Sequence, residues 1–366
     1  MKNKNKIDIL HINHNSFGTE GLYEDGIVHS LSDLYKQEIF VHSDFPINYG
    51  HKLFFKFASK LHLAPRTLPL QVVKFFDLCF DWVVIYLYIW RIRPSLVNLS
   101  LLSRFMLPER MFVLAVCKLK GVKVALTCHD VIPFGSKKDK VIAARKKVIN
   151  SVDYLIIHSK SSLNDLINTF AVDSNKVVYH PFPLMDFSRM MNVADKVKDV
   201  DFLFTGYIRE EKGIFVLLDA WKEFHKTNIS AKLVIAGAVA VDNFNIEQYS
   251  NLNIEFKLYF LSPEEYIDYL TRSKCVVLPY LHGTNSGILY SALATNCSII
   301  TSDIPMFKSN PIVGKENMFK SGDSADLLRL LKSFNFNIHQ MKKDKADYNN
   351  QYKDLIRAAY QKMMDN

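Results

Sequence analysis

Two short segments that combine glycine with cations or amides carry the clearest chemistry in this sequence. Residues 206–213 include Gly206, Arg209 and Lys212, and follow an apolar run at 202–204. The pattern predicts a strand, a sharp turn and a helix, with two cations where the strand end meets the helix start. In an open parallel sheet that position suits an anion, and a diphosphate is the natural candidate. For this segment alone, a solvated charged turn is the commoner explanation.

A second strand, loop and helix are predicted over residues 279–294. The loop is small and rich in amides, with Asn285, Ser286 and Gly287, and the helix continues from Ile288. The free N–H groups at the start of such a helix favour an anion. An ordinary capped helix, with Asn285 or Ser286 as the cap, is the alternative.

Two further candidates lie in the first half of the chain. His129 follows a predicted strand at 122–127. A lone histidine there is more often structural than catalytic, but the carboxyl end of a strand in a doubly wound sheet also suits a functional side chain. Gly18 and Gly21 lie in a loop after the first predicted strand, at 7–13. This loop suits a ligand pressed against the backbone, although its spacing matches no strict fingerprint.

Alternating strands and helices must position these residues. The alternation predicts an α/β fold of parallel sheets with helices on both faces, and 366 residues fit two domains. We expect an N-terminal domain over 1–185, a linker over 186–200 and a second domain over 201–345. A C-terminal helix at 346–366 is expected to pack back on the N-terminal domain.

The net charge of +9 is concentrated between residues 104 and 147, where eleven Lys or Arg side chains stand against three acidic ones. An anionic membrane surface or a phosphorylated acceptor suits this excess. Nucleic acid ranks last, because no binding motif accompanies the charge. Residues 51–61 predict an amphipathic basic helix, a second candidate for a membrane surface. Residues 72–93 predict a core helix rather than a membrane span, because Lys74 and two aspartates interrupt the apolar run.

Cysteine usage and the N-terminus bear on the compartment. The five cysteines are scattered singly, which indicates reduced, buried thiols. The apolar stretch near the N-terminus is short and interrupted, which predicts a first strand rather than a signal peptide. We therefore expect a cytoplasmic protein, and the basic window at 104–147 with residues 51–61 favours a peripheral position at the inner face of a membrane.

The order and spacing of these motifs resemble the donor domain of retaining GT-B glycosyltransferases in the large family 4 group. The resemblance is strong from 201 to 303 and looser before 120, and residues 120–134 and 171–183 are similar to the acceptor domain of the same family. The donor-domain segments that carry it are 206–213, 233–237, 259–266, 277–280, 286–289, 292–294 and 298–303.

The resemblance implies two Rossmann-like doubly wound domains facing across a cleft. It implies transfer of a sugar, with retention, from a nucleotide diphosphate sugar. We expect a UDP- or GDP-sugar as donor and a glycan or lipid-linked acceptor in cell-surface polysaccharide or glycan synthesis. No metal and no separate cofactor are implied, because side-chain cations and helix amides neutralise the departing diphosphate.

The resemblance also implies roles for individual residues. Arg209 and Lys212 match the pair that grips the donor phosphates and stabilises the leaving group, and His129 matches a histidine that touches the transferred sugar. The other implied donor-binding residues are Gly18 and Gly21 near the phosphates, Gly206 at the turn, Tyr259, Phe260 and Leu261 beside the base, and Asn285, Ser286, Gly287, Ile288 and Ser291 around the helix start.

One departure from the family pattern concerns a pair of glutamates separated by seven residues. The matching positions fall at about Gly283 and Ser291, and neither is acidic. We interpret the chain as a divergent member in which residues 285–287 replace the acidic motif. A non-catalytic module that binds sugar nucleotides or glycans is the alternative, and the same fold also supports sugar-phosphate phosphorylases and epimerases.

Overall fold

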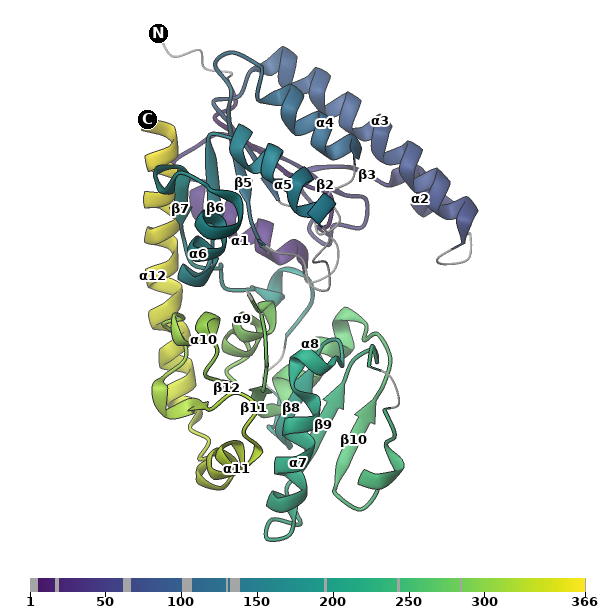
Figure 1. Ribbon diagram of the computed structural model, residues 1–366, viewed down its shortest axis with the longest axis vertical. Helices are drawn as coiled ribbons and strands as arrows, with labels where there is room; N and C mark the ends of the chain where they lie inside the picture. The colour runs from purple at the N-terminus through teal and green to yellow at the C-terminus, as the bar shows by residue number, and fades with distance from the viewer. Residues whose placement is uncertain are drawn as a thin grey trace. The chain divides into compact units, whose positions relative to one another are not determined.

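The computed structural model describes residues 6–16, 20–61, 67–100, 107–129, 131, 139–193, 196–241, 244–283 and 285–365. The chain divides into two compact units (Figure 1). The first comprises Met1–Pro183 with Tyr352–Asn366, and the second comprises Leu184–Gln351. Each unit is built on one parallel sheet with helices around it, so the predicted α/β class is confirmed.

The first unit holds a seven-stranded parallel sheet. Its strands are β1 (Ile9–Asn13), β2 (Gln37–His42), β3 (His51–Phe54), β4 (Leu96–Ser100), β5 (Lys123–Thr127), β6 (Tyr154–Ile157) and β7 (Val177–Tyr179). Their order is β3-β2-β1-β4-β5-β6-β7, so the chain reverses direction across the sheet between β1 and β4. All residues of β1 and β4 are buried, as expected for a parallel sheet covered on both faces.

Six helices connect these strands. They are α1 (Gly21–Leu31), α2 (Lys56–Lys60), α3 (Leu68–Ile92), α4 (Leu107–Val116), α5 (Asp139–Ser151) and α6 (Lys160–Phe170). The core joins the sheet to α3 and α4 through Trp82 and Phe112, whose ring centroids are 4.4 Å apart.

The second unit holds a six-stranded parallel sheet in the order β10-β9-β8-β11-β12-β13. These strands are β8 (Val200–Thr205), β9 (Leu233–Ala236), β10 (Ile254–Lys257), β11 (Ser273–Leu278), β12 (Ser298–Ser302) and β13 (Met318–Phe319). The helices are α7 (Ile214–His225), α8 (Pro263–Arg272), α9 (Gly287–Ala294), α10 (Pro305–Lys308) and α11 (Ser324–Ser333). Trp221 of α7 is fully buried, and its Nε1 donates to the carbonyl oxygen of Leu252 at 2.7 Å.

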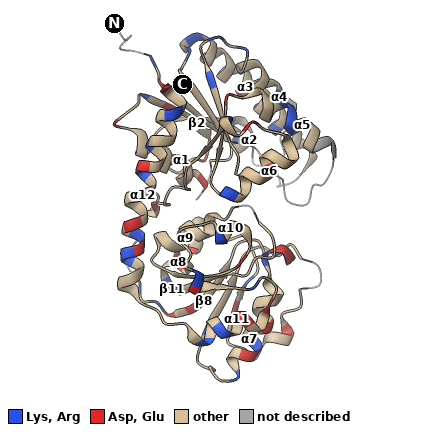
Figure 2. Cartoon of the chain, turned by 60° about the vertical axis from the view of Figure 1, so that its left-hand side comes forward, with Lys and Arg blue, Asp and Glu red and all other residues tan. Residues whose placement is uncertain are grey.

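The C-terminal helix α12 (Ile338–Asp365) begins in the second unit, eight residues before the expected start, and ends in the first. Both signs of charge alternate along it (Figure 2). Buried Tyr360 fixes its last part, because Asn98 of β4 donates to the Tyr360 hydroxyl at 2.9 Å. Arg357 adds a hydrogen bond from its Nε to the carbonyl oxygen of Ser30 at 2.9 Å.

The expected linker at 186–200 lies wholly within the second unit. Its first residues are not a solvated connection, because the Phe187 side chain is 4% exposed and its ring centroid lies 6.4 Å from that of Tyr266. Met185 is also buried, and its Sδ accepts from the Ser291 hydroxyl at 3.4 Å. Burial of these apolar side chains places the unit boundary before Leu184.

Residues 51–61 do not form the expected continuous basic helix. Instead, β3 adds to the sheet edge, and the short α2 follows Phe55, whose φ of 61° interrupts the chain direction. The structure thus corrects the expectation of an amphipathic helix there, because buried Phe54 is used by the sheet. In the part of the chain that the structure describes, no helix has the length and apolar character needed to cross a membrane.

Candidate functional site

The loops after β8 and β11 meet at the carboxyl edge of the second sheet. The two strands are neighbours, with Cys275 of β11 paired to Phe202 of β8, and the chain reverses direction across the sheet between them. Such a switch point is where open α/β sheets bind ligands. The main-chain N–H of Leu281 donates to the carbonyl oxygen of Glu211 at 2.9 Å, which ties the two loops together.

Three glycines allow this close approach. Gly206 has φ +98°, and a Cβ there would lie 2.8 Å from Cδ1 of Ile288 at the start of α9. Gly213 has φ +69°, and its Cβ would lie 1.8 Å from the carbonyl oxygen of Pro279. A Cβ on Gly237, after β9, would lie 1.8 Å from the carbonyl oxygen of Gly206. Side chains at these positions would push the loops apart, so the turn geometry depends on glycine.

Both cations of the first loop lie against aromatic rings. Lys212 Nζ is 3.6 Å from the centroid of the Tyr280 ring, and the Arg209 guanidinium carbon is 4.8 Å from that of Tyr207. Such cation–π contacts hold a cation without neutralising it. Among the described residues, neither cation has a carboxylate partner, although Glu210 and Glu211 are adjacent in sequence. These residues therefore do not form a charged turn in which the two cations pair with the neighbouring glutamates.

The start of α9 faces the same loops through Ile288. Ser286 is its N-cap, but no side chain among the described residues caps the helix. The Ser286 hydroxyl instead lies 3.2 Å from the Tyr280 hydroxyl, and the Asn285 Oδ1 accepts from the Ser286 N–H at 2.9 Å. The capped-helix alternative is therefore not observed here. The first N–H groups of α9 keep their preference for an anion.

An aromatic surface borders the cations. Tyr259 and Phe260 follow β10 and are 47% and 70% exposed, and Tyr207 is 48% exposed. The ring centroids of Tyr207 and Phe260 are 6.3 Å apart, while the Tyr259 hydroxyl donates to Glu265 at 2.7 Å. Leu261, predicted with them, is partly buried. Exposed rings beside cations can stack on a planar base.

Ser291 differs from the other predicted residues of this group. Its side chain is 1% exposed, and its hydroxyl donates to the carbonyl oxygen of Gly287 at 3.1 Å. The hydroxyl therefore offers no accessible surface to a bound donor. This burial follows from the helical period, because Ser291 lies one turn after Gly287 on the inner face of α9.

Sequence reasoning assigned no role to Tyr207 or Tyr280. Tyr280 is 1% exposed and contacts both Lys212 and Ser286, so it connects the two loops. Their positions in the sequence could have indicated a role in the site. Each tyrosine lies two residues after the end of its strand, β8 or β11, at the sheet edge where cations were already expected.

In the first unit, His129 follows β5 and packs among rings. Its ring centroid lies 4.6 Å from that of Tyr23, 5.4 Å from that of His158 and 6.1 Å from that of Phe182. Burial lowers the pKa of His129 to about 4, so the imidazole is neutral near pH 7. A neutral imidazole can donate one hydrogen bond and accept one, but it carries no charge to offset a phosphate.

Two glycines after the first strand, Gly18 and Gly21, were predicted to lie near the donor phosphates. Gly21 begins α1, and a Cβ there would lie 2.9 Å from the Phe45 ring and 2.9 Å from Cδ of Pro46. Its small size is therefore used by packing within the first unit. Gly18, like Asp130 beside His129, lies outside the described residues.

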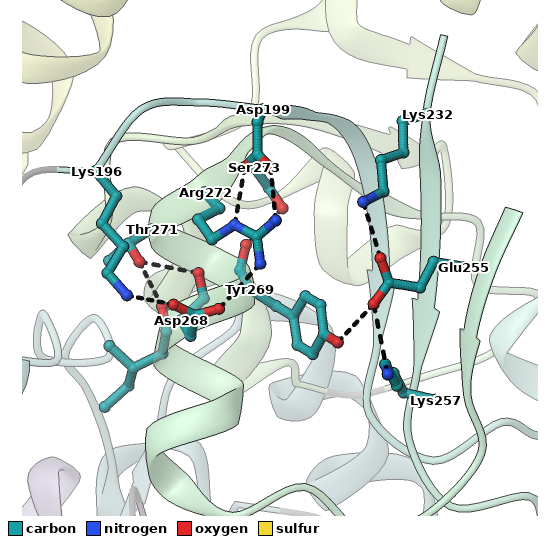
Figure 3. Close-up of polar contacts among 11 residues, drawn as sticks. Lys196, Asp199, Lys232, Glu255, Lys257, Asp268, Tyr269, Thr271, Arg272 and Ser273 are labelled. Atoms are coloured by element: carbon teal, nitrogen blue, oxygen red, sulfur yellow. Dashed lines mark hydrogen bonds and ion pairs between the residues drawn. The ribbon is translucent and has the colours of Figure 1, made fainter. Parts of the chain in front are cut away.

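A different group of charges lies at the amino edge of the second sheet (Figure 3). Arg272, the last residue of α8, donates to Asp199 through Nε at 2.8 Å and through Nη2 at 2.5 Å. Its Nη1 reaches Asp268 at 3.2 Å, and Lys196 pairs with the same carboxylate. The Arg272 hydrogen bond is the main cause that holds the pKa of Asp199 below its usual range. These charges are matched within the protein.

Comparison with known proteins relates the second unit to a family. Residues 188–354 match the model of the family described as Glycosyl transferases group 1. The match covers almost the whole unit that contains the two loops, including the cations and α9. Among curated proteins, none matches this chain significantly.

Solved structures share the architecture over nearly the whole chain. Sucrose-phosphate synthase from Thermosynechococcus elongatus is 14% identical with a TM-score of 0.59, covering 98% of this chain and 96% of that one. Anabaena HepE, in complex with UDP and glucose, is 11% identical with a TM-score of 0.62, covering 97% and 98%. The catalytic domain of Arabidopsis thaliana starch synthase IV, bound to ADP and acarbose, is 9% identical with a TM-score of 0.63, covering 99% and 100%.

At these identities the likeness concerns the fold. The chain has the GT-B architecture of two Rossmann-like parallel-sheet domains, which confirms the fold prediction. The roles of the individual site residues stay predictions.

Proposed function

We propose that this protein is a glycosyltransferase that takes its sugar from a nucleoside diphosphate sugar. The observation that carries the proposal is the pair of cations, Arg209 and Lys212, without carboxylate partners among the described residues, beside the uncapped start of α9. This arrangement lies within a match to Glycosyl transferases group 1. Two cations and helix N–H groups at one switch point suit a diphosphate better than a single phosphate.

In this proposal the cations work on the leaving group. As the bond between sugar and diphosphate breaks, negative charge grows on the departing phosphate, and Arg209, Lys212 and the first amides of α9 stabilise it. We expect the reaction to proceed without a metal for this reason, and with retention at the anomeric carbon. Exposed Phe260 and Tyr207 would pack against the base, which we expect to be that of a UDP- or GDP-sugar.

The remaining parts of the proposal concern the acceptor. We propose a glycan or lipid-linked acceptor in the synthesis of a cell-surface polysaccharide, with the protein peripheral at the inner membrane face. The net charge of +9 and the excess of cations between 104 and 147 support a negatively charged surface as partner. Neutral His129 suits a hydrogen bond to a sugar hydroxyl rather than a charge interaction.

A ligand panel tests the donor site on the full chain. We expect UDP or GDP to raise the melting temperature more than UMP or GMP at equal concentration, because only the diphosphates reach both cations. Equal stabilisation by mono- and diphosphates would contradict the assignment.

Turnover separates an enzyme from a binding module. The absence of acidic residues at Gly283 and Ser291 favours the alternative of a non-catalytic sugar-nucleotide binding module. Release of UDP or GDP from a panel of nucleotide sugars, with and without membrane extract as acceptor, distinguishes the two. Binding without release under every condition would support the binding module.

A further inference from the structure

The long helix α3 carries an apolar face that remains exposed. Eight side chains share this face, and each is between 43% and 72% exposed. We call them the α3 stripe: Leu68, Val72, Phe75, Phe76, Phe80, Val83, Leu87 and Trp90. They recur every three or four residues, which places them on one side of the helix over about 33 Å. Phe57 of α2, 58% exposed, extends the stripe, with its ring centroid 6.3 Å from that of Phe80.

The opposite face of α3 already attaches the helix to the protein. Its apolar residues Leu78, Trp82, Ile85 and Ile89 are at most 5% exposed and belong to the core of the first unit. The core-helix expectation for residues 72–93 therefore holds for one face only. The α3 stripe is not needed to hold the helix in place, and an exposed apolar row of this length indicates a binding surface.

The two acidic residues of α3 also face the protein. The Asp77 carboxylate accepts from the main-chain N–H groups of Phe57 at 3.0 Å and Ala58 at 2.8 Å. The Asp81 carboxylate accepts from the N–H of Phe55 at 3.1 Å. Both aspartates are less than 5% exposed, so neither contributes negative charge to the outer surface of the helix.

The charges around the α3 stripe are positive. Exposed cations of this region are Lys52, Lys56, Lys60, Lys74 and Arg91. Within the described parts of 51–61 and 67–93, no acidic side chain is exposed. The helix is drawn mostly in tan, the colour of uncharged residues, in Figure 2. Lys56 and Lys60 lie on α2 with Phe57, and Arg91 lies in the last turn of α3, so cations border the apolar stripe at these places. Lys74 lies on the other side of α3, with its Nζ 5.8 Å from the centroid of the Phe55 ring.

We propose that the α3 stripe docks this protein on an anionic lipid bilayer, with α3 lying in the plane of the interface. Apolar side chains would enter the acyl boundary, while the bordering cations would meet anionic headgroups. Trp90 and the phenylalanines suit that depth. A second copy of the chain is the less favourable occupant, because it would bring two cationic borders together. The proposal rests on the peripheral-membrane part of the proposed function and is independent of the transfer chemistry.

Vesicle sedimentation of the full chain tests this docking. We expect binding to vesicles of phosphatidylglycerol and phosphatidylcholine in equal parts, and weaker binding to phosphatidylcholine alone. Phe76→Ser with Leu87→Ser should weaken binding at least about 30-fold, because two exposed apolar side chains no longer enter the bilayer. The matched control, Val197→Ser with Ile229→Ser, changes two side chains of the second unit that are 84% and 73% exposed, and should change binding less than about twofold.

The contribution of the cations to vesicle binding and the depth at which α3 inserts are measured in separate experiments. Lys56→Gln with Lys60→Gln and Arg91→Gln should weaken binding to the anionic vesicles at least about tenfold. Trp90 is 57% exposed, whereas Trp82 and Trp221 are 5% and 0% exposed. Nitroxide-labelled lipids should therefore quench the fluorescence of Trp90, and this quenching should be lost in the Trp90→Phe variant.

Several results would overturn the proposal. One is no binding of the wild-type chain to anionic vesicles at low salt, and another is binding of the Phe76→Ser, Leu87→Ser variant as tight as that of the wild type. A third is a wild-type dimer that dissociates in this variant, with no binding of either protein to vesicles. Circular dichroism of each variant checks its folding. Stabilisation by UDP or GDP, measured on the same variants, should be unchanged, so failure of the docking proposal and failure of the donor site give different results.

Discussion

At the amino edge of the second sheet, Arg272 is held by two carboxylates, whereas at the carboxyl edge Lys212 lies on the ring of Tyr280 and Arg209 on that of Tyr207. Both edges are rich in charge, but Arg272 is paired with acids, whereas Arg209 and Lys212 have no carboxylate partner among the described residues. Matched ion pairs at a surface add little stability, and they leave no charge for a ligand. Cations held by aromatic faces keep their charge, which is what an anion site requires.

The largest expected effect is on the carboxyl edge. Arg209→Ala with Lys212→Ala should weaken binding of UDP or GDP about 100-fold or more, because two charge-assisted contacts to the diphosphate are lost. The matched control is Lys222→Ala with Lys226→Ala, which removes one cation from the last turn of α7 and one from the residue that follows it. Titration calorimetry should show unchanged affinity for the control. Equal losses in both variants would mean that only net charge matters.

Gly206→Ala should come next, through the shape of the turn. We expect a loss of about 1 to 3 kcal/mol in the free energy of unfolding, because the new Cβ must adopt φ +98° and lies 2.8 Å from Ile288. Gly121→Ala is a useful control, since Gly121 has φ +75° but nothing within 4 Å of its Cβ. Urea unfolding of both variants separates backbone strain from the contact with α9. A smaller loss in Gly206→Ala than in the control would contradict the tight approach.

Tyr280 tests whether the aromatic ring or its hydroxyl holds the site together. Tyr280→Phe keeps the ring beneath Lys212 and removes the contact with Ser286, so we expect a loss of about 0.5 to 1.5 kcal/mol in stability. Diphosphate affinity should fall less than about tenfold in Tyr280→Phe and further in Tyr280→Leu, which also removes the cation–π contact. The same affinity in both variants would show that Lys212 does not depend on the ring.

The smallest effect is expected at the amino edge. Asp199→Asn should lower the free energy of unfolding by less than about 1 kcal/mol, because the pair with Arg272 is partly exposed, and should leave diphosphate affinity unchanged. The Arg272 hydrogen bond lowers the pKa of Asp199, so its contribution is present above the usual aspartate pKa and disappears as the pH falls through the lower folded value. Unfolding of both proteins between pH 7 and pH 2 checks this. A difference that grows on acidification would contradict the sign.

Much of the second unit was predictable from local pattern. The apolar run of β8, the glycines at 206 and 213 and the helical spacing of α7 identify a strand, turn and helix because each signal involves residues close in sequence. The likeness of the motif order to glycosyltransferases extended this to the fold.

Other features required distant residues. The contact of Gly206 with Ile288 and that of Lys212 with Tyr280 join segments more than 60 residues apart, and no local pattern specifies such pairs. Burial of Ser291 depends on which face of α9 meets the core, so its predicted role in donor binding has no exposed surface to support it. The prediction of a helix at 51–61 was wrong because His51–Phe54 pairs with β2 as the edge strand β3. This strand pairing outweighs the helical spacing of the lysines in the segment.

By itself, the sequence determined the alternating α/β fold, the two glycine-bearing loops and the presence of cations in one of them, because these follow from spacing and residue type. Only the tertiary structure decided which charges are matched and which apolar surfaces are covered. An α3 that is apolar on nearly every side gives no sequence signal for its outer face, since exposure depends on where α2, α4 and the sheet end. The same holds for Arg209 and Lys212, whose acidic neighbours in sequence are not their partners in space.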